Sequence, residues 1–486
     1  MLVAGKRVVD YCVKTIIVPG ILWLVLGTQL SSCNRELDFE RIPDSVRTSV
    51  TDRIPRFIDK YHNRKTDLTI VLIDGSISAD LGFASKRPDS AYRPPCTTDF
   101  NIPSFIEEKL RWSGQQFRRY DANVEQQSST KVFSETGTAV TRQYDGAWDW
   151  QNNPPQQNGY NGMTRILTGS KPSVSFRFPA KAKRNDFIYR TDYLSSAALK
   201  VSVGQAGIVE VFDEKESMWR EADGFVFSAK EKDELIPGEY FPGQPFAATS
   251  LRKSIYQKRL KMRALKSHAD VNVSIASTDG GRLCYWGVSF SPAETMLQFI
   301  NSARGSHNIA LLTYFEAWSI DYWKPDLILY SCNTINEGAD ASTLNTLNSP
   351  TNFGDRFETY ITRLLNKPYK PEMFAYILFT AKAHGLINEQ DVVGEASIKN
   401  YGEASVFDFI TELDKRLKKL PVASANAFNF FWETAKKNAE AKRTTIYKQM
   451  FADGGPKGPG FVSDYTHLND YGAQVGWQYL QNYFNF

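Results

Sequence analysis

Three residues of this 486-residue sequence have types and positions that suit nucleophilic catalysis. Ser76 comes just after the apolar, β-branched run 67–73, and a serine at the carboxyl end of a buried strand exposes its hydroxyl for attack. His467, one of five histidines, lies three residues after Asp464. An aspartate at that spacing can orient the imidazole, which then takes the proton of a serine. The residues predict a serine nucleophile with a histidine base. The alternative for the Asp464 segment is a surface turn capped by aspartate.

The elements that position these residues form an alternating pattern. The runs 67–73 and 325–330 have the composition of buried parallel strands. Helices are predicted at 102–120, 293–300, 309–321, 355–365, 403–418, 428–450 and 474–483. Strands that alternate with helices indicate an α/β doubly wound parallel sheet, which binds its substrate at the carboxyl ends of the strands.

A region without helical periodicity interrupts this pattern. Short alternating runs occur at 173–178, 199–203, 208–212, 225–227, 260–265 and 271–275. Such runs predict an inserted all-β domain, a β-sandwich. We therefore expect an export segment at 1–33, a linker at 34–66, the first part of the α/β domain at 67–125, the β-sandwich at 126–292 and the second part of the α/β domain at 293–486.

Three motifs, in chain order, resemble those of the SGNH (GDSL-type) hydrolase family. They are Gly75-Ser76-Ile77-Ser78 at a strand end, an Asn-rich turn after the strand Pro-Asp-Leu-Ile-Leu, and Asp464-Tyr-Thr-His-Leu-Asn469. The resemblance covers about 67–122 and 293–486. It implies a three-layer, flavodoxin-like fold with an inserted β-domain similar to carbohydrate-binding domains. The implied chemistry is hydrolysis of O-acetyl esters on glycans through an acyl-serine.

The resemblance also implies roles for individual residues. Ser76 matches the nucleophile, His467 the general base, and Asp464 the carboxylate that orients it. The oxyanion hole would be formed by Ser76, Gly305 and Asn336, with Asn333 as a rival to Asn336. The sequence departs from the family pattern in two places: Asp74-Gly75-Ser76 stands where Gly-Asp-Ser is common, and Cys332-Asn333-Thr-Ile-Asn336-Glu337 stands where Gly-x-Asn-Asp is usual.

Further residues are candidates for substrate contact. Arg304 and His307 flank Gly305 and either bind substrate or simply pack, and Tyr465 is a candidate for contact with a sugar ring. Trp148 and Trp150 are candidates for stacking on sugar rings, although most aromatic residues belong to cores. We expect no metal site and no cofactor. Cys332 is predicted to be a buried or disulfide-bonded thiol rather than a nucleophile, because no histidine accompanies it in sequence.

The N-terminus has the features of an export signal. Basic residues precede the apolar run 15–30, which is too short to span a membrane comfortably. Leu30-Ser-Ser-Cys33 resembles the lipobox of bacterial lipoproteins, which implies lipidation of Cys33 and a location in the outer membrane, on its periplasmic or cell-surface side. A retained signal anchor or a buried helix are the alternatives. In an oxidising compartment, two of Cys96, Cys284 and Cys332 could form a disulfide, and the pairing stays open.

Composition excludes one class of partner. The chain has 58 Lys and Arg against 54 Asp and Glu, a net charge of +4, and lacks the basic excess of a nucleic-acid-binding protein. The sequence therefore predicts a lipid-anchored serine esterase that acts on an acylated polysaccharide or peptidoglycan. A catalytically impaired glycan-binding surface protein and a bacteriophage virion esterase are the alternatives.

Overall fold

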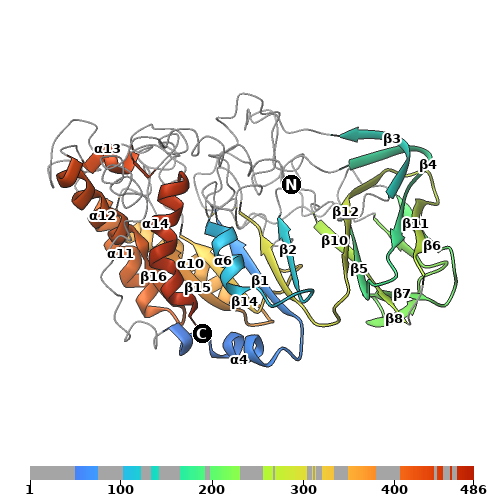
Figure 1. Cartoon of the computed structure of the whole chain (residues 1–486), viewed down its shortest axis with the longest axis horizontal. Helices are drawn as coiled ribbons and strands as arrows, with labels where there is room; N and C mark the ends of the chain where they lie inside the picture. The colour runs from blue at the N-terminus through green and yellow to red at the C-terminus, as the bar shows by residue number, and fades with distance from the viewer. Residues whose placement is uncertain are drawn as a thin grey trace, which may run out of the picture. The chain divides into compact units, whose positions relative to one another are not determined.

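The computed structural model describes the parts of the chain that form its two sheets and their helices (Figure 1). These are residues 50–74, 102–121, 133–141, 165–191, 197–229, 256–265, 269–303, 309, 312, 320–332, 349–378, 406–442, 446–451, 460–461 and 468–485. All of them belong to one compact unit, Ser45–Phe486. In this part of the chain, no helix has the length and apolar character needed to cross a membrane.

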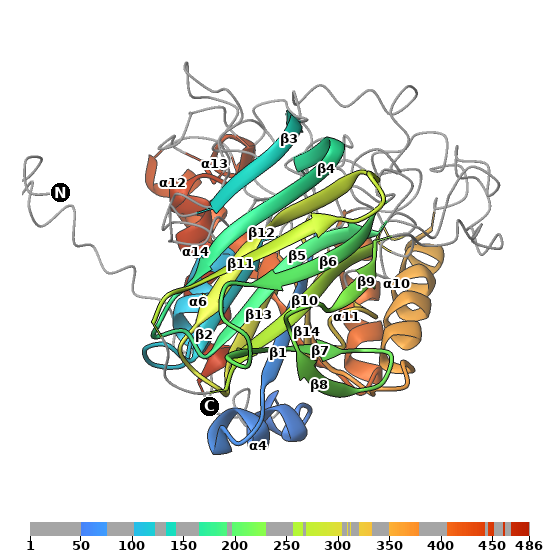
Figure 2. The same ribbon diagram turned by 90° about the vertical axis from the view of Figure 1, so that its right-hand side faces the viewer.

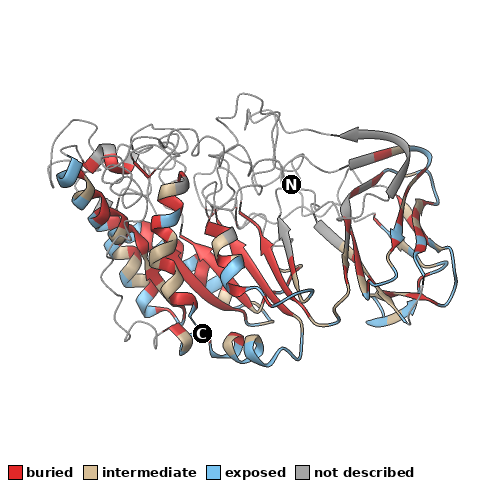
Figure 3. Cartoon of the chain, viewed as in Figure 1, coloured by how far each residue is buried: buried red, intermediate tan, exposed pale blue. Residues whose placement is uncertain are grey.

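Six parallel strands form the sheet of the α/β domain. Their spatial order is β16 (Ala423–Asn426), β15 (Glu372–Ile377), β14 (Leu327–Ser331), β1 (Leu68–Ile73), β13 (Leu297–Asn301) and β2 (Phe117–Asp121). Apart from the edge strand β2, the strands in chain order are arranged 2-1-3-4-5, the flavodoxin-like order. Every residue of β1, β13, β14 and β15 is buried, as Figure 3 shows for the sheet. The predicted fold class is confirmed.

Helices cover both faces of this sheet, which makes three layers. Figure 2 shows α6 (Ile102–Leu110), α12 (Ala427–Lys442) and α14 (Asp470–Leu480) on one side, and α10 (Pro350–Leu365) and α11 (Val406–Lys419) on the other. Tyr330 of β14 packs on Tyr360 of α10, with ring centroids 5.5 Å apart. The short helix α13 (Ile446–Phe451) follows α12, and the 3-10 helix η8 (Gln481–Phe484) extends α14. Aromatic contacts of this kind hold the layers together.

The predicted linker at 34–66 ends in helix α4 (Pro55–Asn63), which packs against the α/β domain. Phe57 of this helix is buried, and its backbone N–H donates to the Glu372 carboxylate at 2.6 Å. The backbone N–H of Arg56 donates to the same carboxylate at 3.1 Å. A carboxylate at a helix N-terminus satisfies N–H groups that lack partners inside the helix. Helix α4 therefore packs on the α/β domain, while residues 34–49 of the predicted linker lie outside the described residues.

Two helix predictions are wrong. The segment predicted as a helix at 293–300 contains strand β13, because a central strand is apolar on both faces and its short run resembles a buried helix. The helix predicted at 102–120 ends at Leu110, and 117–121 forms β2. Gly114 lies between them at φ 67°, in the left-handed region that glycine adopts easily. Within the predicted helix 428–450 the structure describes α12 and α13, and residues 443–445 between them lie outside the described residues.

The inserted domain is all β, as predicted. Within the described residues it has ten strands, which form one antiparallel sheet. The strand order is β8-β7-β10-β5-β12-β4-β11-β6-β9, with β3 beside β4. The strands are β3 (Phe133–Thr141), β4 (Arg165–Phe178), β5 (Arg184–Thr191), β6 (Ala198–Val203), β7 (Val209–Asp213), β8 (Met218–Glu221), β9 (Val226–Ser228), β10 (Tyr256–Ala264), β11 (Val271–Ser277) and β12 (Leu283–Ser291). The sheet folds back on itself, since the ring of Tyr189 in β5 contacts that of Phe227 in β9, with centroids 5.2 Å apart.

Polar contacts join the inserted domain to the parallel sheet. Arg118 of β2 and Asp186 of β5 form a buried ion pair at 2.8 Å. Arg259 of β10 donates to Gln298 of β13, and its guanidinium lies 4.6 Å from the Trp323 ring. Buried charges are tolerated only when they are paired, so these contacts specify how the two sheets dock.

Candidate active site at the carboxyl edge of the sheet

Three neighbouring strands end together at one edge of the parallel sheet. Asp74 follows β1 and has an exposed fraction of 0%. Ser302 follows β13 and donates its backbone N–H to Leu72 at 2.9 Å. Cys332 follows β14 and donates its backbone N–H to Tyr376 at 2.8 Å. Neighbouring strands lie about 4.8 Å apart, so these ends form one compact edge.

The first three candidate loops begin at these strand ends. Ser76 comes two residues after Asp74, Gly305 two residues after Ala303, and Asn333 directly after Cys332. Two residues of extended chain span at most about 7 Å, so the loops begin within reach of one another. Ser76, Gly305, Asn333 and Asn336 themselves lie outside the described residues, and their roles stay predictions.

The fourth candidate loop is closed by Asn469. This side chain has an exposed fraction of 0%, and its Oδ1 accepts the N–H of Gly472 at 2.8 Å as the N-cap of α14. Its Nδ2 donates to the Gly460 carbonyl at 2.7 Å, and its backbone N–H donates to the Phe461 carbonyl at 2.9 Å. Asn469 thus joins both ends of the segment 462–467, which contains Asp464 and His467 and lies outside the described residues.

Gly472 permits this closure. A Cβ atom at this position would lie 2.1 Å from the Phe461 carbonyl oxygen, far inside van der Waals contact. Asn469 is predicted only as part of the Asp464–Asn469 motif, and its structural role was missed. The available signal was an asparagine directly before a helix, which is typical of an N-cap.

The start of α14 lies at the same edge as the end of β1. A Cβ atom on Gly476, in the second turn of α14, would lie 3.2 Å from Leu378, the residue after β15. Farther along, Tyr483 and Phe484 pack on Phe374, near the start of β15. Helix α14 therefore runs antiparallel to β15, with its N-terminus beyond the carboxyl ends of the strands (Figure 1). The loop closed by Asn469 and the loop after β1 leave from one edge.

Two polar groups at this edge were not predicted to have a role. The Ser302 hydroxyl is buried and has no hydrogen-bond partner in the described part of the chain. The Oδ1 atom of Asn301 accepts the N–H of Ala303 at 3.1 Å. Both groups lie at the strand end that precedes the predicted oxyanion loop.

Cys332 is a free, buried thiol. Burial, and then the charge of Asp74, raises the pKa of this thiol well above its usual value. The thiolate is the nucleophilic form, so the environment disfavours attack by Cys332. Because this thiol is free, the predicted disulfide pairings that include Cys332 are excluded. Cys96 and the side chain of Cys284 lie outside the described residues.

The chain is structurally similar to GDSL-type and carbohydrate esterases. A peptidoglycan O-acetylesterase matches at 12% identity over 89% of this chain and 94% of its own, with a TM-score of 0.43. A family two carbohydrate esterase from Clostridium thermocellum matches at 7% identity over 72% and 96%, with a TM-score of 0.24. A GDSL-like lipase from Parabacteroides merdae matches at 10% identity over 38% and 73%, with a TM-score of 0.27. No protein-family model and no curated protein matches the sequence.

The remaining candidate residues lie outside the described part of the chain. They are Cys33, Trp148, Trp150, Arg304, His307 and Tyr465. Among the described residues, no group of three His, Cys, Asp or Glu side chains is arranged to hold a metal ion. The described residues therefore form one edge of the sheet, where four loops begin and polar groups are buried. Flavodoxin-like folds bind ligands at this edge.

Proposed function

We propose that this protein is a serine esterase that removes O-acetyl or similar small acyl groups from a polysaccharide or peptidoglycan. The main support is the common edge from which the loops of Ser76, Gly305, Asn333 and His467 begin. The first and last of these residues, Ser76 and His467, are 391 positions apart in sequence, and the fold brings the origins of their loops to one edge. The order of the motifs in the chain supports the same assignment.

In the proposed reaction, the Ser76 hydroxyl attacks the acyl carbonyl carbon while His467 accepts its proton. Asp464 orients the imidazole and stabilises its charged form. N–H donors of Ser76, Gly305 and one of the two asparagines stabilise the oxyanion, each by about 3 kcal/mol. His467 then protonates the departing sugar oxygen, which leaves an acyl-serine. Water, deprotonated by His467, hydrolyses this intermediate to the free acid and regenerates Ser76.

The test is acetate release from an O-acetylated polysaccharide and hydrolysis of a chromogenic acetate. We expect both, with a rate that rises as pH passes through about 6 to 7, where histidine loses its proton and becomes a base. The His467→Ala variant should lose this pH dependence together with most of the rate. A wild-type protein that releases no acetate from either substrate would contradict the proposal and favour the glycan-binding alternative.

We further propose that the mature protein is exported and anchored through a lipid on Cys33. The support is the lipobox-like Leu30-Ser-Ser-Cys33 after a basic segment and a short apolar run. In a bacterial host that processes lipoproteins, mass spectrometry should find a mature chain that begins with a lipidated Cys33. The Cys33→Ser variant should lose the lipid and appear in the soluble fraction. Recovery of an intact Met1 from the wild type would exclude this processing.

A further inference from the structure

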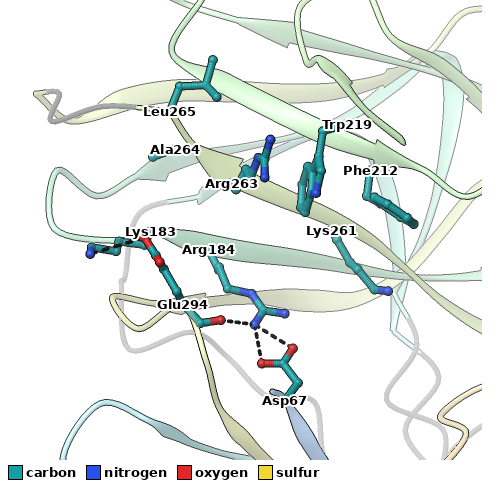
Figure 4. A pocket seen from close by; sticks show the side chains of 10 residues that line it. All are labelled: Asp67, Lys183, Arg184, Phe212, Trp219, Lys261, Arg263, Ala264, Leu265 and Glu294. Atoms are coloured by element: carbon teal, nitrogen blue, oxygen red, sulfur yellow. Dashed lines mark hydrogen bonds and ion pairs between the residues drawn. The ribbon is translucent and has the colours of Figure 1, made fainter. Parts of the chain in front are cut away.

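A pocket of about 520 Å³ lies between the inserted β-domain and the α/β sheet (Figure 4). This volume is in the range of small-ligand sites, roughly 300–1,000 Å³. The residues that line it are Asp67, Lys183, Arg184, Phe212, Trp219, Lys261, Arg263, Ala264, Leu265 and Glu294. Four of these are cations and two are carboxylates, so the lining has an excess of positive charge.

The carboxylates leave one of these cations unpaired. Asp67 binds Arg184 at 2.9 Å, and Glu294 lies 3.6 Å from Lys183. Arg263 pairs at 2.7 Å with Glu210, which is outside the lining. Among the described residues, the ammonium group of Lys261 has no carboxylate within ion-pair distance and no hydrogen bond. Its ammonium group lies 5.2 Å from the centroid of the Phe212 ring.

The environment of Lys261 favours an anionic ligand. Burial, and then the charge of nearby Arg259, lowers the pKa of this lysine, and the charges of Glu214 and Asp186 offset only part of that shift. A lowered pKa means that the protein stabilises the charged form of Lys261 less well than water does. A carboxylate placed beside the ammonium group would supply that stabilisation. Arg184 lies on the neighbouring strand, with its guanidinium on the same side of the pocket in Figure 4.

The pocket also has aromatic side chains that contact its cations, since the Arg263 guanidinium lies 4.3 Å from the centroid of the Trp219 ring. Phe212 and Trp219 are paired across strands β7 and β8, with ring centroids 5.3 Å apart. Leu265 lines the pocket and is 49% exposed, while Met218, beside Trp219, is 50% exposed. These are two of the three large hydrophobic residues that are exposed in the described part of the chain. Exposed apolar groups beside a charged pocket indicate a binding surface.

The pocket is separate from the candidate active site. Asp67 precedes β1 and Glu294 precedes β13, so the pocket lies at the amino edge of the parallel sheet. The candidate catalytic loops leave from the carboxyl edge. Seven residues of extended strand separate Asp67 from Asp74, a distance of about 23 Å. A ligand in the pocket therefore cannot be the acyl group that reacts.

We propose that this pocket binds a uronic-acid residue of an acidic polysaccharide. The sugar carboxylate pairs with Lys261, and the apolar face of the ring packs on Trp219 and Phe212. A polymer held here would have other residues about 23 Å away at the catalytic edge, which raises their effective concentration there. That the bound polymer is also the substrate rests on the proposed function, whereas the binding itself does not.

The test is calorimetric titration of the full chain with tetragalacturonate and with neutral cellotetraose. We expect tetragalacturonate to bind, and to bind more weakly at high ionic strength, because an ion pair contributes to the affinity. Lys261→Gln should lower the affinity by about tenfold, the value of one hydrogen bond to a charged group. Lys261→Arg should keep most of the affinity. Lys200→Gln, an exposed lysine on β6 away from the pocket, should bind as the wild type does.

The same variants separate this proposal from the esterase. Ser76→Ala should lose hydrolysis of a chromogenic acetate and keep tetragalacturonate binding, whereas Lys261→Gln should show the tenfold weaker binding described above. Three results would overturn the pocket proposal: no binding of tetragalacturonate by the wild type, equal binding of cellotetraose, or equal affinities of Lys261→Gln and the wild type. Displacement of tetragalacturonate by inorganic phosphate at similar concentrations would also overturn it, since the site would then be a general anion site.

Discussion

The Ser76→Ala variant is expected to lose ester hydrolysis by at least about 10⁴-fold, because no other group in the proposed mechanism forms the acyl intermediate. The substitution removes one oxygen atom from a loop position, so the fold should be retained. The measurement is the turnover of a chromogenic acetate, with thermal unfolding followed in parallel. A wild-type preparation treated with a phosphonate that labels active serines should also carry the label on Ser76.

Ser78 provides a matched control for this experiment. It is a serine in the same segment, two residues farther along the chain. Ser78→Ala should hydrolyse the acetate at close to the wild-type rate and should still be labelled at Ser76. If Ser76→Ala and Ser78→Ala turn over equally, Ser76 is not the nucleophile and the proposed mechanism fails.

Asn469→Ala should destabilise the protein and impair hydrolysis together. The variant loses the N-cap of α14 and leaves the Gly460 carbonyl without its donor in a buried position. These losses should lower the free energy of unfolding by about 3 kcal/mol. The segment 462–467, which contains Asp464 and His467, would lose the residue that joins its two ends. Denaturant unfolding and acetate hydrolysis measure the two effects.

Two variants separate the closure of the loop from helix capping. Asn469→Asp keeps the acceptor for Gly472 but removes the donor to Gly460, so its stability should lie between those of the wild type and Asn469→Ala. Ser349→Ala removes the side-chain N-cap of α10, which accepts from Asn352 at 3.2 Å on the surface. It should cost about 1 kcal/mol and leave hydrolysis unchanged. Equal effects of Ser349→Ala and Asn469→Ala on hydrolysis would contradict the role assigned to Asn469.

The sequence predicts strands best where burial on both faces produces a β-branched run. β1 and β14 were predicted for this reason. β13 was predicted as a helix, because Met296 and Leu297 do not distinguish a strand from a helix. β5 was missed because Asn185 and Asp186 interrupt its apolar pattern. Both residues are buried, and Asp186 has its partner Arg118 in a distant strand. A pairing between residues so far apart leaves no local signal.

The candidate site shows the same limit. The spacing of Asp464 and His467 and the position of Ser76 after a strand are local patterns, and they could be identified in the sequence. The closure by Asn469 depends on Gly460 and Phe461, and the buried hydroxyl of Ser302 depends on its place beside β1. The charge imbalance at Lys261 arises only when Asp67 and Glu294 have been assigned to other cations. These features are consequences of the tertiary structure.

The position of the inserted domain affects the order in which the chain can fold. β2 and β13 are parallel neighbours, so the whole inserted domain takes the place of the crossover that normally joins two such strands. β1 pairs with β13 through contacts such as Leu68 with Leu297, which are far apart in sequence. During synthesis, β1 therefore cannot pair with β13 until the whole inserted β-domain has been synthesised. Contacts of such long range slow folding, and the early segment is exposed to aggregation until β13 arrives.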